Sequence, residues 1–464
     1  MYKFLIMADL TVGNEGKLIF KFAVPMLLGN VFQQLYSFIN SIIVGNYLGK
    51  SALAAVSASF PIIFLLISLV MGIGIGSSIL ISQYYGARDI QKVRKAIDTT
   101  YIFLFTSSIL ITILGIVFSE DILRWTRLPE ELIPQAKTYL NVYLLGMIFF
   151  FGFNGSSAAL RGLGDSKTPL YFLIIANITN IFFDLLLIRV FKLGVEGAAI
   201  ATIISQGGAF ITMVLYLNKY HEIVKLRIFH LQFDKEIFKK SLQIGLPTGL
   251  QQTFVSMGML ALNFIINPFG TNTIAAYGVA GRIDSFAALP AMNFAAALSS
   301  FVGQNLGANK PERVKKGFIA TLKMTSIISV SVSIIVFIWG KGIMNLFTPD
   351  HNVIDIGYQY LIIVCSFYIL FSTMFIIGGV MRGAGDTLIP MFITLFALWV
   401  IRIPLAYFLA PKFGVIGIWW AIPIAWSIGM SFSYFYYLTG RWKKKVVVKY
   451  KEKLKVEVIE NELI

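Results

Sequence analysis

Long apolar runs separated by short polar stretches predict membrane-spanning helices. The runs without any Asp, Glu, Lys or Arg include Thr99–Ser119, Thr138–Leu160, Gly197–Asn218, Gly357–Met381 and Phe413–Gly440. Each is long enough for the ~20 residues that a helix needs to cross the hydrocarbon core. Lipid cannot satisfy backbone N–H and C=O groups, so such runs must form helices or closed barrels. Because they lack the alternation of a barrel strand, we expect helices.

Gly, Pro and charged residues divide these runs into twelve expected spans. Two of the divisions are short Gly-containing breaks, Asn46–Lys50 and Asn267–Asn272, in otherwise continuous hydropathy. The expected spans are 18–45, 52–84, 97–119, 136–160, 168–190, 195–217, 241–267, 272–304, 317–340, 356–381, 387–410 and 414–439. The pattern therefore predicts an all-α integral membrane protein with twelve transmembrane helices.

The two halves of the chain resemble each other at an offset of 221 residues. The matched pairs include Gly49 with Gly270, Gln83 with Gln304, Gly86 with Gly307, Arg161 with Arg382 and Asp165 with Asp386, and, after one-residue slips, Pro25 with Pro247 and Gly194 with Gly414. Each half holds six spans, so both halves enter the membrane from the same side and form a parallel internal repeat. We expect two six-helix bundles at 1–217 and 241–439, a cytoplasmic linker at 218–240 and a basic cytoplasmic tail at 440–464.

Basic residues gather at alternate ends of the expected spans. One set of ends, which includes both termini, holds 28 of the 39 Lys and Arg residues, and the opposite loops hold 8. The other three are Arg282, Lys323 and Arg402, inside or near spans. Cytoplasmic loops retain Lys and Arg, so we predict a plasma (inner) membrane protein with both termini in the cytoplasm. The tail either contacts anionic lipid or is a solvated segment that only supports this topology.

Composition narrows the classes of function. Apolar residues make up 57% of the chain and charged residues only 13%, whereas about a quarter of a soluble domain is charged. The net charge of +16 follows from the loop asymmetry, so we expect no nucleic-acid partner. A single cysteine, Cys365, excludes a disulfide within the chain. No His lies in a span and no convergent nucleophile or metal set is visible there, which argues against an integral-membrane enzyme.

Asp184 is the one carboxylate well inside the N-terminal half. It lies in NITNIFFDLLLI, and Asn180 precedes it by one helical turn on the same face. A carboxylate beside an amide oxygen suits Na⁺, or a proton retained because burial disfavours the charged form. The alternative is a hydrated Asp near a helix end that serves topology alone.

Three charged residues lie in or near the C-terminal spans. Arg282 and Asp284 belong to AAYGVAGRIDSFAALPAMNF, and Arg402 belongs to LWVIRIPLAYF. Charges in a bilayer are costly, so these residues either pair to hold helices together or bind a substrate or coupling ion. Both roles stay open at this stage. The many Phe, Tyr and Met side chains could supply adaptable walls for chemically varied ligands.

A series of short motifs resembles the multidrug and toxic compound extrusion (MATE) family over residues 18–438. The motifs include QQLY separated from Pro25 by seven residues, VGNYLGKSALAA, SQYYGARD, ALRGLGDSKTP, AAYGVAGRIDSF, VGQNLGANKPERVKKG and VMRGAGDT. Each motif alone is loose, and their order together with the repeat carries the resemblance. The resemblance implies two six-helix lobes arranged as a V.

The resemblance also implies a coupling-ion site for Na⁺ or H⁺ in the N-terminal lobe. One branch of the family builds it from an Asp on helix 1, an Asn and an Asp on helix 5 and a Thr on helix 6. The matching positions here are Asn40, Asn180, Asp184 and Thr202, with Tyr36 and Asn154 nearby. Asn40 departs from that branch, which has Asp there.

A second branch of the family uses acids on helices 7 and 10. Those positions are Val255 and Phe371 in this chain, so Asp284 is the remaining carboxylate of the C-terminal lobe. We assign to the substrate cavity Tyr36, Asn154, Asp284, Arg282 and Arg402. We expect no cofactor besides the coupling ion and no metal beyond Na⁺.

The resemblance implies a secondary active antiporter that exports amphipathic or cationic drug-like compounds by alternating access. We expect a monomer in the bilayer, with small molecules as its substrates. A flippase for lipid-linked precursors, or a polysaccharide exporter, is the nearest alternative and would show more basic residues along its cavity. A passive channel would not need two tandem six-helix lobes.

Overall fold

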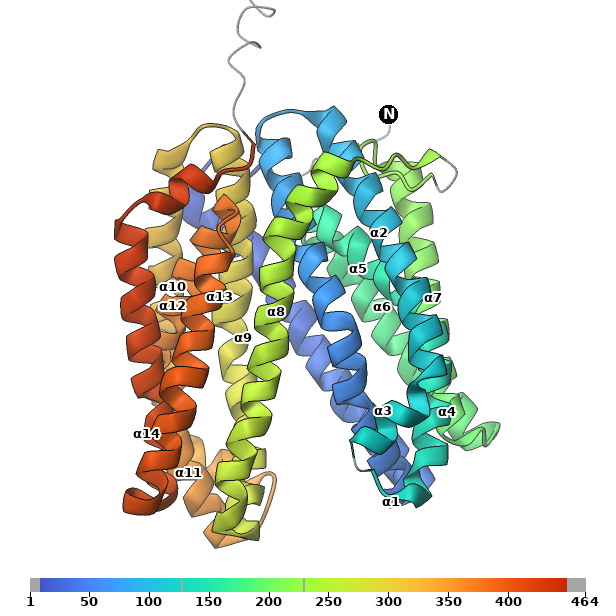
Figure 1. Ribbon diagram of the computed structural model, residues 1–464, viewed down its shortest axis with the longest axis vertical. Coiled ribbons are helices and arrows are strands. Elements are labelled where there is room, and N and C mark those ends of the chain that lie inside the picture. The colour runs from blue at the N-terminus through green and yellow to red at the C-terminus, as the bar shows by residue number, and fades with distance from the viewer. Residues whose placement is uncertain (1–8, 127, 228–229, 449–464) are drawn as a thin grey trace, which may run out of the picture.

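The computed structural model describes residues 9–126, 128–227 and 230–448, and its regular elements are helices (Figure 1). The first half contains α1 (Glu15–Gly86), α2 (Ile90–Val117), α3 (Ser119–Trp125), η1 (Glu130–Leu132), α4 (Ile133–Leu145), α5 (Met147–Gly162), α6 (Lys167–Asp184), η2 (Leu185–Val190) and α7 (Gly194–Tyr220). The second half contains α8 (Lys235–Ile266), η4 (Asn267–Phe269), α9 (Thr271–Gly307), α10 (Pro311–Asn345), α11 (His351–Cys365), α12 (Tyr368–Ala384), α13 (Leu388–Leu395), η5 (Phe396–Arg402), α14 (Ile403–Leu438) and η6 (Arg441–Lys445).

The predicted twelve spans are confirmed once the breaks in the long helices are counted. Eight helices of the described chain can span a membrane by length and composition, or ten when the bent pairs α4–α5 and α11–α12 each count as one span. Two of these ten segments each contain two spans. Helix α1 breaks at Gly49 (φ 84°) and the Leu388–Leu438 segment breaks at Gly414 (φ 61°), positive φ values that favour glycine.

The expected break near Asn267–Asn272 is also present. Residues Asn267–Phe269 form a short 3₁₀ turn, and Gly270 follows with a φ of 91°. Gly270 is the repeat partner of Gly49, so equivalent glycines reverse the chain in both halves. The segment between α7 and α8 overlaps the linker expected at 218–240. The first eight residues and residues 449–464 of the expected tail lie outside the described residues.

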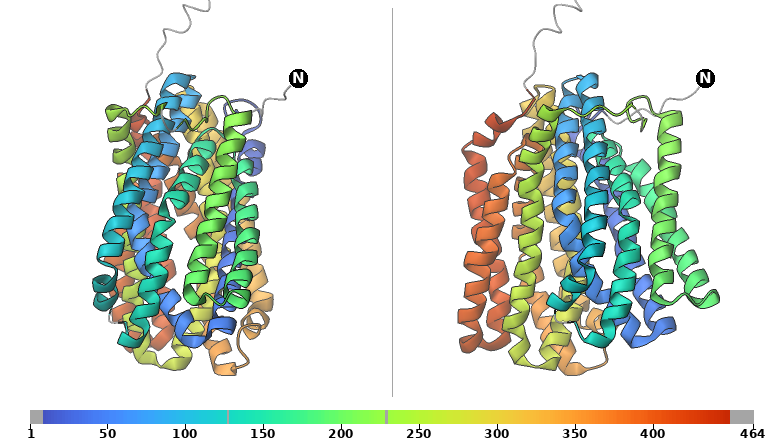
Figure 2. Two further views of the ribbon diagram at one scale, coloured as in Figure 1. Left: turned by 90° about the vertical axis from the view of Figure 1, so that its right-hand side faces the viewer. Right: turned by 45° about the vertical axis from the view of Figure 1, so that its right-hand side comes forward.

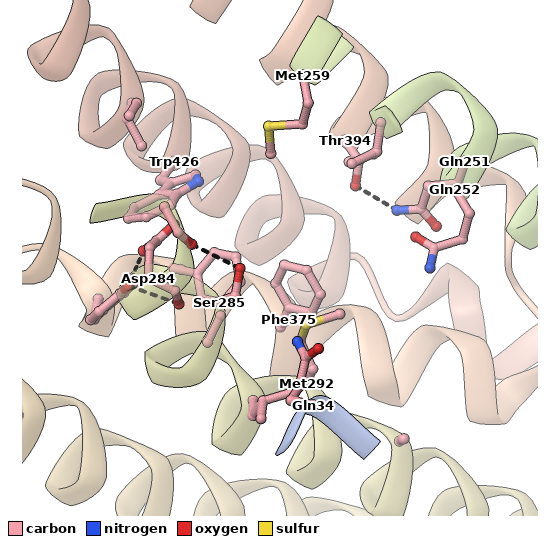
Figure 3. A pocket seen from close by; sticks show the side chains of 18 of the residues that line it. Gln34, Gln251, Gln252, Met259, Asp284, Ser285, Met292, Phe375, Thr394 and Trp426 are labelled. Atoms are coloured by element: carbon pink, nitrogen blue, oxygen red, sulfur yellow. Dashed lines mark hydrogen bonds between the residues drawn. The ribbon is translucent and has the colours of Figure 1, made fainter. Parts of the chain in front are cut away.

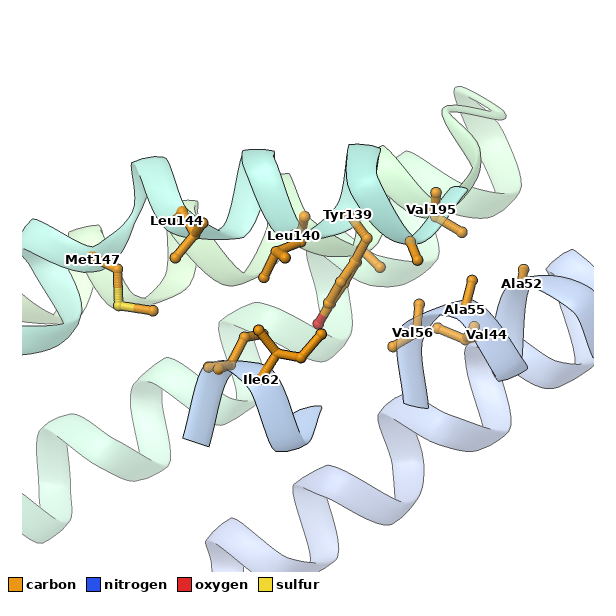
Figure 4. Close-up of a cluster of buried hydrophobic side chains, with 14 of the residues drawn as sticks. Val44, Ala52, Ala55, Val56, Ile62, Tyr139, Leu140, Leu144, Met147 and Val195 are labelled. Carbon is orange, nitrogen blue, oxygen red and sulfur yellow. The ribbon is translucent and has the colours of Figure 1, made fainter. Parts of the chain in front are cut away.

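Each half of the chain has its own hydrophobic core. In the first half, one cluster joins α1, α4 and α7 through Val44, Val56, Tyr139, Leu140 and Val195 (Figure 4). In the second half, a cluster around the fully buried Trp419 joins α9, α11 and α14. Each bundle of helices is therefore held together by its own packing, and we call the bundles the N-lobe and the C-lobe.

The two ends of the described chain pack across the lobes. Leu10 and Phe22, at the start of the chain, belong to a buried cluster with Phe294 and Phe301 of the C-lobe. Val448, at the other end, belongs to a cluster with Tyr84 of the N-lobe. Both ends emerge on the same side of the bundle, which we call the terminal face (Figures 1 and 2).

The lobes meet near the terminal face and diverge toward the opposite end (Figure 1). Glycines allow the close approach between α1 and α8. A methyl group at Gly72 would lie 2.6 Å from the carbonyl oxygen of Gly245, and one at Gly76 would lie 2.6 Å from the backbone nitrogen of Gly245. Small residues of this kind let helix backbones pack closely in a membrane, where the hydrophobic effect does not drive helices together.

Two fully buried glutamines cross from one lobe to the other at this contact. Nε2 of Gln83 donates to the carbonyl oxygen of Gly383 at 3.0 Å, and Nε2 of Gln304 donates to that of Gly162 at 3.0 Å. The two glutamines are repeat partners, and so are the two glycines. The bonds therefore form one symmetric latch, which we call the glutamine latch.

The chain ends complete the hydrogen bonding of the glutamine latch. Oε1 of Gln304 accepts from the backbone N–H of Leu10 at 3.1 Å. Oε1 of Gln83 accepts from the N–H groups of Val447 at 3.1 Å and Val448 at 3.2 Å. Buried amide groups left without partners are costly, so the terminal segments stabilise the closed contact.

An ion pair holds the first terminal segment in place. Asp9 accepts from the backbone and hydroxyl of Thr11 at 2.9 Å and 2.6 Å, and it pairs with Arg88 at 2.5 Å. Burial raises the pKa of Asp9, but the bonds from Thr11 and Arg88 outweigh burial and bring that pKa below its ordinary value. The carboxylate therefore stays ionised, and its contribution to stability is lost only in acid below its ordinary pKa.

We expect Gly245→Ala to destabilise the protein by disrupting the contact between α1 and α8. Forcing a methyl group into packed structure costs about 1–3 kcal/mol, which corresponds to a lowering of the thermal midpoint by about 1–3 °C for a chain of this length. Gly278→Ala is the matched control, because no atom lies within 4 Å of a methyl group there. Circular dichroism of both purified variants makes the measurement. Equal midpoints for the two variants would contradict the packing argument.

Candidate functional site

A cavity of about 1110 Å³ lies between the lobes. Helices α8, α9 and α12 and the segment from α13 to α14 supply most of its walls, and α1, α5, η4 and α11 supply the rest. Figure 3 shows its mixed character, with Met259, Met292 and Phe375 beside the amides of Gln34 and Gln251. Large apolar pockets with a few polar groups are the usual form of small-molecule sites.

Asp284 is the single carboxylate among the residues that line this cavity. Tyr360 donates to its Oδ2 at 3.3 Å, and Tyr368 donates a shorter bond to its Oδ1. The ring of Tyr368 stacks on Trp426 with centroids 5.9 Å apart. The carboxylate is thus held by tyrosines from α11 and α12 within an aromatic wall (Figure 3).

Arg282 and Arg402, which we assigned to the substrate cavity, also line this cavity. Among the described residues neither arginine lies within 4.0 Å of a carboxylate, so direct ion pairing with Asp284 is not formed. The guanidinium of Arg282 lies over the ring of Phe38 in the N-lobe, 5.5 Å from its centroid. Arg402 is buried, and its Nε has no hydrogen-bond partner within the described part of the chain.

A second polar cluster lies inside the N-lobe, around Asp184. This side chain is fully buried, and Nδ2 of Asn40 donates to its Oδ2 at 2.9 Å. The Asn40 amide also lies 3.4 Å from the hydroxyl of Tyr36. Asn180 donates to Thr202 at 3.3 Å and to Ser205 at 3.1 Å. The structure therefore brings together Asn40, Asn180, Asp184 and Thr202, and we call them the Asp184 cluster.

Two buried oxygen atoms of this cluster lack partners. Oδ1 of Asp184 and Oδ1 of Asn180 are inaccessible and accept no hydrogen bond from any described residue. A buried carboxylate oxygen without a partner is costly. A proton on Asp184 would relieve this cost, and so would a bound Na⁺, because hard cations take carboxylate and amide oxygens as ligands. The donor set therefore fits a proton or Na⁺.

The remaining predicted residues occupy separate places. Tyr36 contacts the Asp184 cluster and is not among the described residues that line the cavity. Asn154 bonds to the carbonyl of Phe150 in its own helix at 2.8 Å and is likewise absent from that lining. Val255 and Phe371, the positions of acids in the second branch, do face the cavity.

Several site residues escaped the sequence analysis. Ser205, Tyr360, Tyr368 and Trp426 look like ordinary residues of apolar spans, and only the packing of helices reveals their contacts. The internal repeat already paired Gln83 with Gln304, but it carried no indication that these side chains cross between lobes.

A family model described as MatE matches the chain twice, over residues 25–186 and 247–408. The chain belongs to the MatE family. The two matches begin at Pro25 and Pro247, which the internal repeat also pairs, so the two family domains coincide with the halves of this MatE protein. The predicted family and two-bundle fold are confirmed.

Relatives of this MatE protein are similar over nearly their whole length. The probable multidrug resistance protein YoeA of Bacillus subtilis is 35% identical over 92% of the chain and 94% of its own. YpnP from the same organism, also named a probable multidrug resistance protein, is 36% identical over 94% and 97%. An outward-facing multidrug resistance MATE transporter structure has a TM-score of 0.89 at 25% identity, covering 96% of this chain and 99% of its own.

We predict that Asn40 sets the Na⁺ affinity of the Asp184 cluster. Asn40→Asp would place a second carboxylate beside Asp184, and two acids attract a cation more strongly, so we expect Na⁺ to bind about tenfold more tightly. Asn40→Ala should weaken the Na⁺ response. The measurement is the rise of the thermal midpoint with Na⁺ concentration at constant ionic strength.

Ser41→Ala is the matched control for this prediction. Ser41 lies next to Asn40 in α1, but it is exposed and bonds to Ser37 of its own helix at 2.9 Å. Its Na⁺ titration should match that of the native protein. Superimposable titrations for Asn40→Asp, Asn40→Ala and the native protein would place Asn40 outside the ion site.

Proposed function

We propose that this MatE protein exports amphipathic or cationic drug-like compounds in exchange for Na⁺ or H⁺. The proposal rests on one observation. The Asp184 cluster and the large cavity are two separate polar sites within the same bundle of helices. The cluster is buried and small enough for an ion, whereas the cavity holds about 1110 Å³. The names of the relatives, as probable multidrug resistance proteins, support the substrate class.

The first segment of α1 provides a physical link between the two sites. Its Asn40 bonds to Asp184, while its Phe38 stacks on Phe286 of the C-lobe with ring centroids 6.1 Å apart. On the same segment, Asn30 donates to Asn293 of the C-lobe at 2.7 Å. An ion that replaces the bond from Asn40 would alter the position of a helix that also forms the boundary between the lobes.

The shape of the contact between the lobes supports alternating access as the proposed mechanism. The glutamine latch closes the terminal face, and we propose that this face is cytoplasmic, in agreement with the distribution of Lys and Arg. The conformation is then the outward-facing one. Export requires the latch to open, so that the cavity can load from the cytoplasm, and then to close again.

A flippase for lipid-linked precursors is the second candidate, and one observation favours it. Four arginines line the cavity, Arg161, Arg282, Arg382 and Arg402, against the one carboxylate of Asp284. Basic lining of this kind suits phosphate groups. Drug transport is still the better-supported function, because relatives similar over almost the whole chain are named for multidrug resistance.

Asp184→Asn should abolish uphill efflux while leaving the protein folded and inserted. The amide can neither carry a proton nor supply a charge for Na⁺. The test is efflux of a fluorescent cation from proteoliposomes under separately imposed Na⁺ and H⁺ gradients. Asp355→Asn, which removes an exposed carboxylate paired with Lys341 at 2.8 Å, is the control. Normal gradient-driven efflux by Asp184→Asn would refute the coupling role.

Cysteine labelling tests the orientation. Cysteines at Lys92 and Lys443, which lie on the terminal face, should resist an impermeant thiol reagent added to intact cells. A cysteine at Lys341, on the opposite face, should react. The native Cys365 is buried, so the unmodified protein provides the background. The reverse pattern would overturn both the orientation and the direction of transport.

A further inference from the structure

Two arginines lie at the closed end of the cavity without acidic partners. Arg161 lies in the last turn of α5 and Arg382 in the last turn of α12, and both line the cavity. They are repeat partners, so the two lobes contribute the same residue to the same end. No described carboxylate lies within 4.0 Å of either, and neither donates a hydrogen bond to any described residue.

The position of the pair is set by the contacts beneath the glutamine latch. Gly162, next to Arg161, packs against the backbone carbonyl of Ser78, and Gly383, next to Arg382, packs against that of Ser299. The carbonyls of these same glycines accept from the latch glutamines. The arginines are therefore anchored directly at the point where the lobes close.

The direction of the Arg382 side chain is unusual for a basic residue at a helix end. Its Nη1 lies 3.3 Å from the position that a side chain on Gly378 would occupy, one turn back along α12. The guanidinium is thus directed away from the terminal face and along the cavity side of the helix. Long basic side chains near helix ends normally extend toward water at the membrane interface. Here Gly378 leaves room for the opposite orientation.

Two serines complete the closed end. Ser78 and Ser299 are repeat partners, line the cavity, and are 8% and 6% exposed. The hydroxyl of Ser299 is buried and has no hydrogen-bond partner among the described residues. Unpaired buried polar groups are rare in native proteins and indicate a missing ligand, ion or water. The serines add hydroxyl donors beside the guanidinium donors.

We propose that Arg161, Arg382, Ser78 and Ser299 form a binding site for the acidic oxyanion group of an amphipathic substrate. Guanidinium groups bind carboxylate and phosphate through paired hydrogen bonds, which are strong when the site is shielded from water. The substrate class is then a compound with an apolar body and a carboxylate or phosphate at one end. This inference rests on the proposed transport function, whose substrate cavity it refines.

The test compares two dyes that differ in one group. Rhodamine 110 carries a free carboxylate, and rhodamine 123 is its methyl ester. Fluorescence anisotropy of the purified protein, at fixed ionic strength and without gradients, gives the Kd of each dye. Arg161→Gln and Arg382→Gln should each weaken binding of rhodamine 110 by about tenfold, the loss of one charge-assisted contact. Binding of rhodamine 123 should change less than twofold.

Control variants distinguish the effect of losing a residue of this site from the effect of losing a positive charge elsewhere. Arg94→Gln makes the same substitution at an exposed residue near the terminal face that does not line the cavity. It should leave the Kd of both dyes unchanged. Ser299→Ala should weaken the binding of rhodamine 110 by about threefold, because one neutral hydrogen bond is lost. Unchanged rhodamine 110 binding in both cavity arginine variants, or equal losses for both dyes, would overturn the proposal.

Competition with the native protein gives a test that needs no variant. Inorganic phosphate, exchanged for chloride at constant ionic strength, should displace rhodamine 110 and spare rhodamine 123. Lysophosphatidic acid that competes at lower concentration than phosphate would identify a lipid head group as the source of the oxyanion. A lack of displacement by both competitors would contradict the site.

The two experiments distinguish a failure of the oxyanion site from a failure of the transport proposal. Arginine-dependent binding of rhodamine 110 without uphill efflux would support the oxyanion site and refute coupled export. Coupled efflux of rhodamine 123, with no effect of either arginine on rhodamine 110, would support export and refute the site.

Discussion

The close contact between the lobes at the terminal face is the interaction on which the remaining structure depends. It buries two glutamines whose side-chain nitrogen and oxygen atoms are each hydrogen-bonded, and it places glycine backbones against one another where any side chain would collide. Such a contact tolerates little distortion, because buried amides without partners and overlapping atoms are both costly. The lobes therefore have a well-defined closed arrangement, and the cavity is open only away from it.

The first segment of α1 connects the Asp184 cluster to that arrangement. It belongs to the N-lobe through Asn40 and Asp184, yet Asn30 and Phe38 contact the C-lobe. A helix shared in this way can transmit a change of one hydrogen bond into a change at the boundary between rigid bodies. The coupling that we propose requires no long chain of residues, only a helix with partners on both sides.

Most of the fold could be predicted from the sequence, because apolar runs and glycine positions depend on the local conformation and surroundings of the chain. Gly49 and Gly270 marked chain reversals that need positive φ, and the repeat required two equal lobes. The Asp184 cluster could be assembled from the turn spacing of Asn180 and the family resemblance. The tyrosines around Asp284 could not, since their roles arise where α11 and α12 pack on α9. The 50° bends at α4–α5 and α11–α12 also escaped, because no proline marks them.

The glutamine latch has a consequence for how the protein is made. Gln83 bonds to partners 300 and 364 residues later in the chain, and these partners do not exist when the N-lobe leaves the ribosome. At ordinary synthesis rates the delay is on the order of 20–70 s. During that time the side-chain amide of Gln83, which is buried in the complete protein, faces lipid or water on the inserted N-lobe. The glutamine latch can therefore form completely only after synthesis has passed Val448.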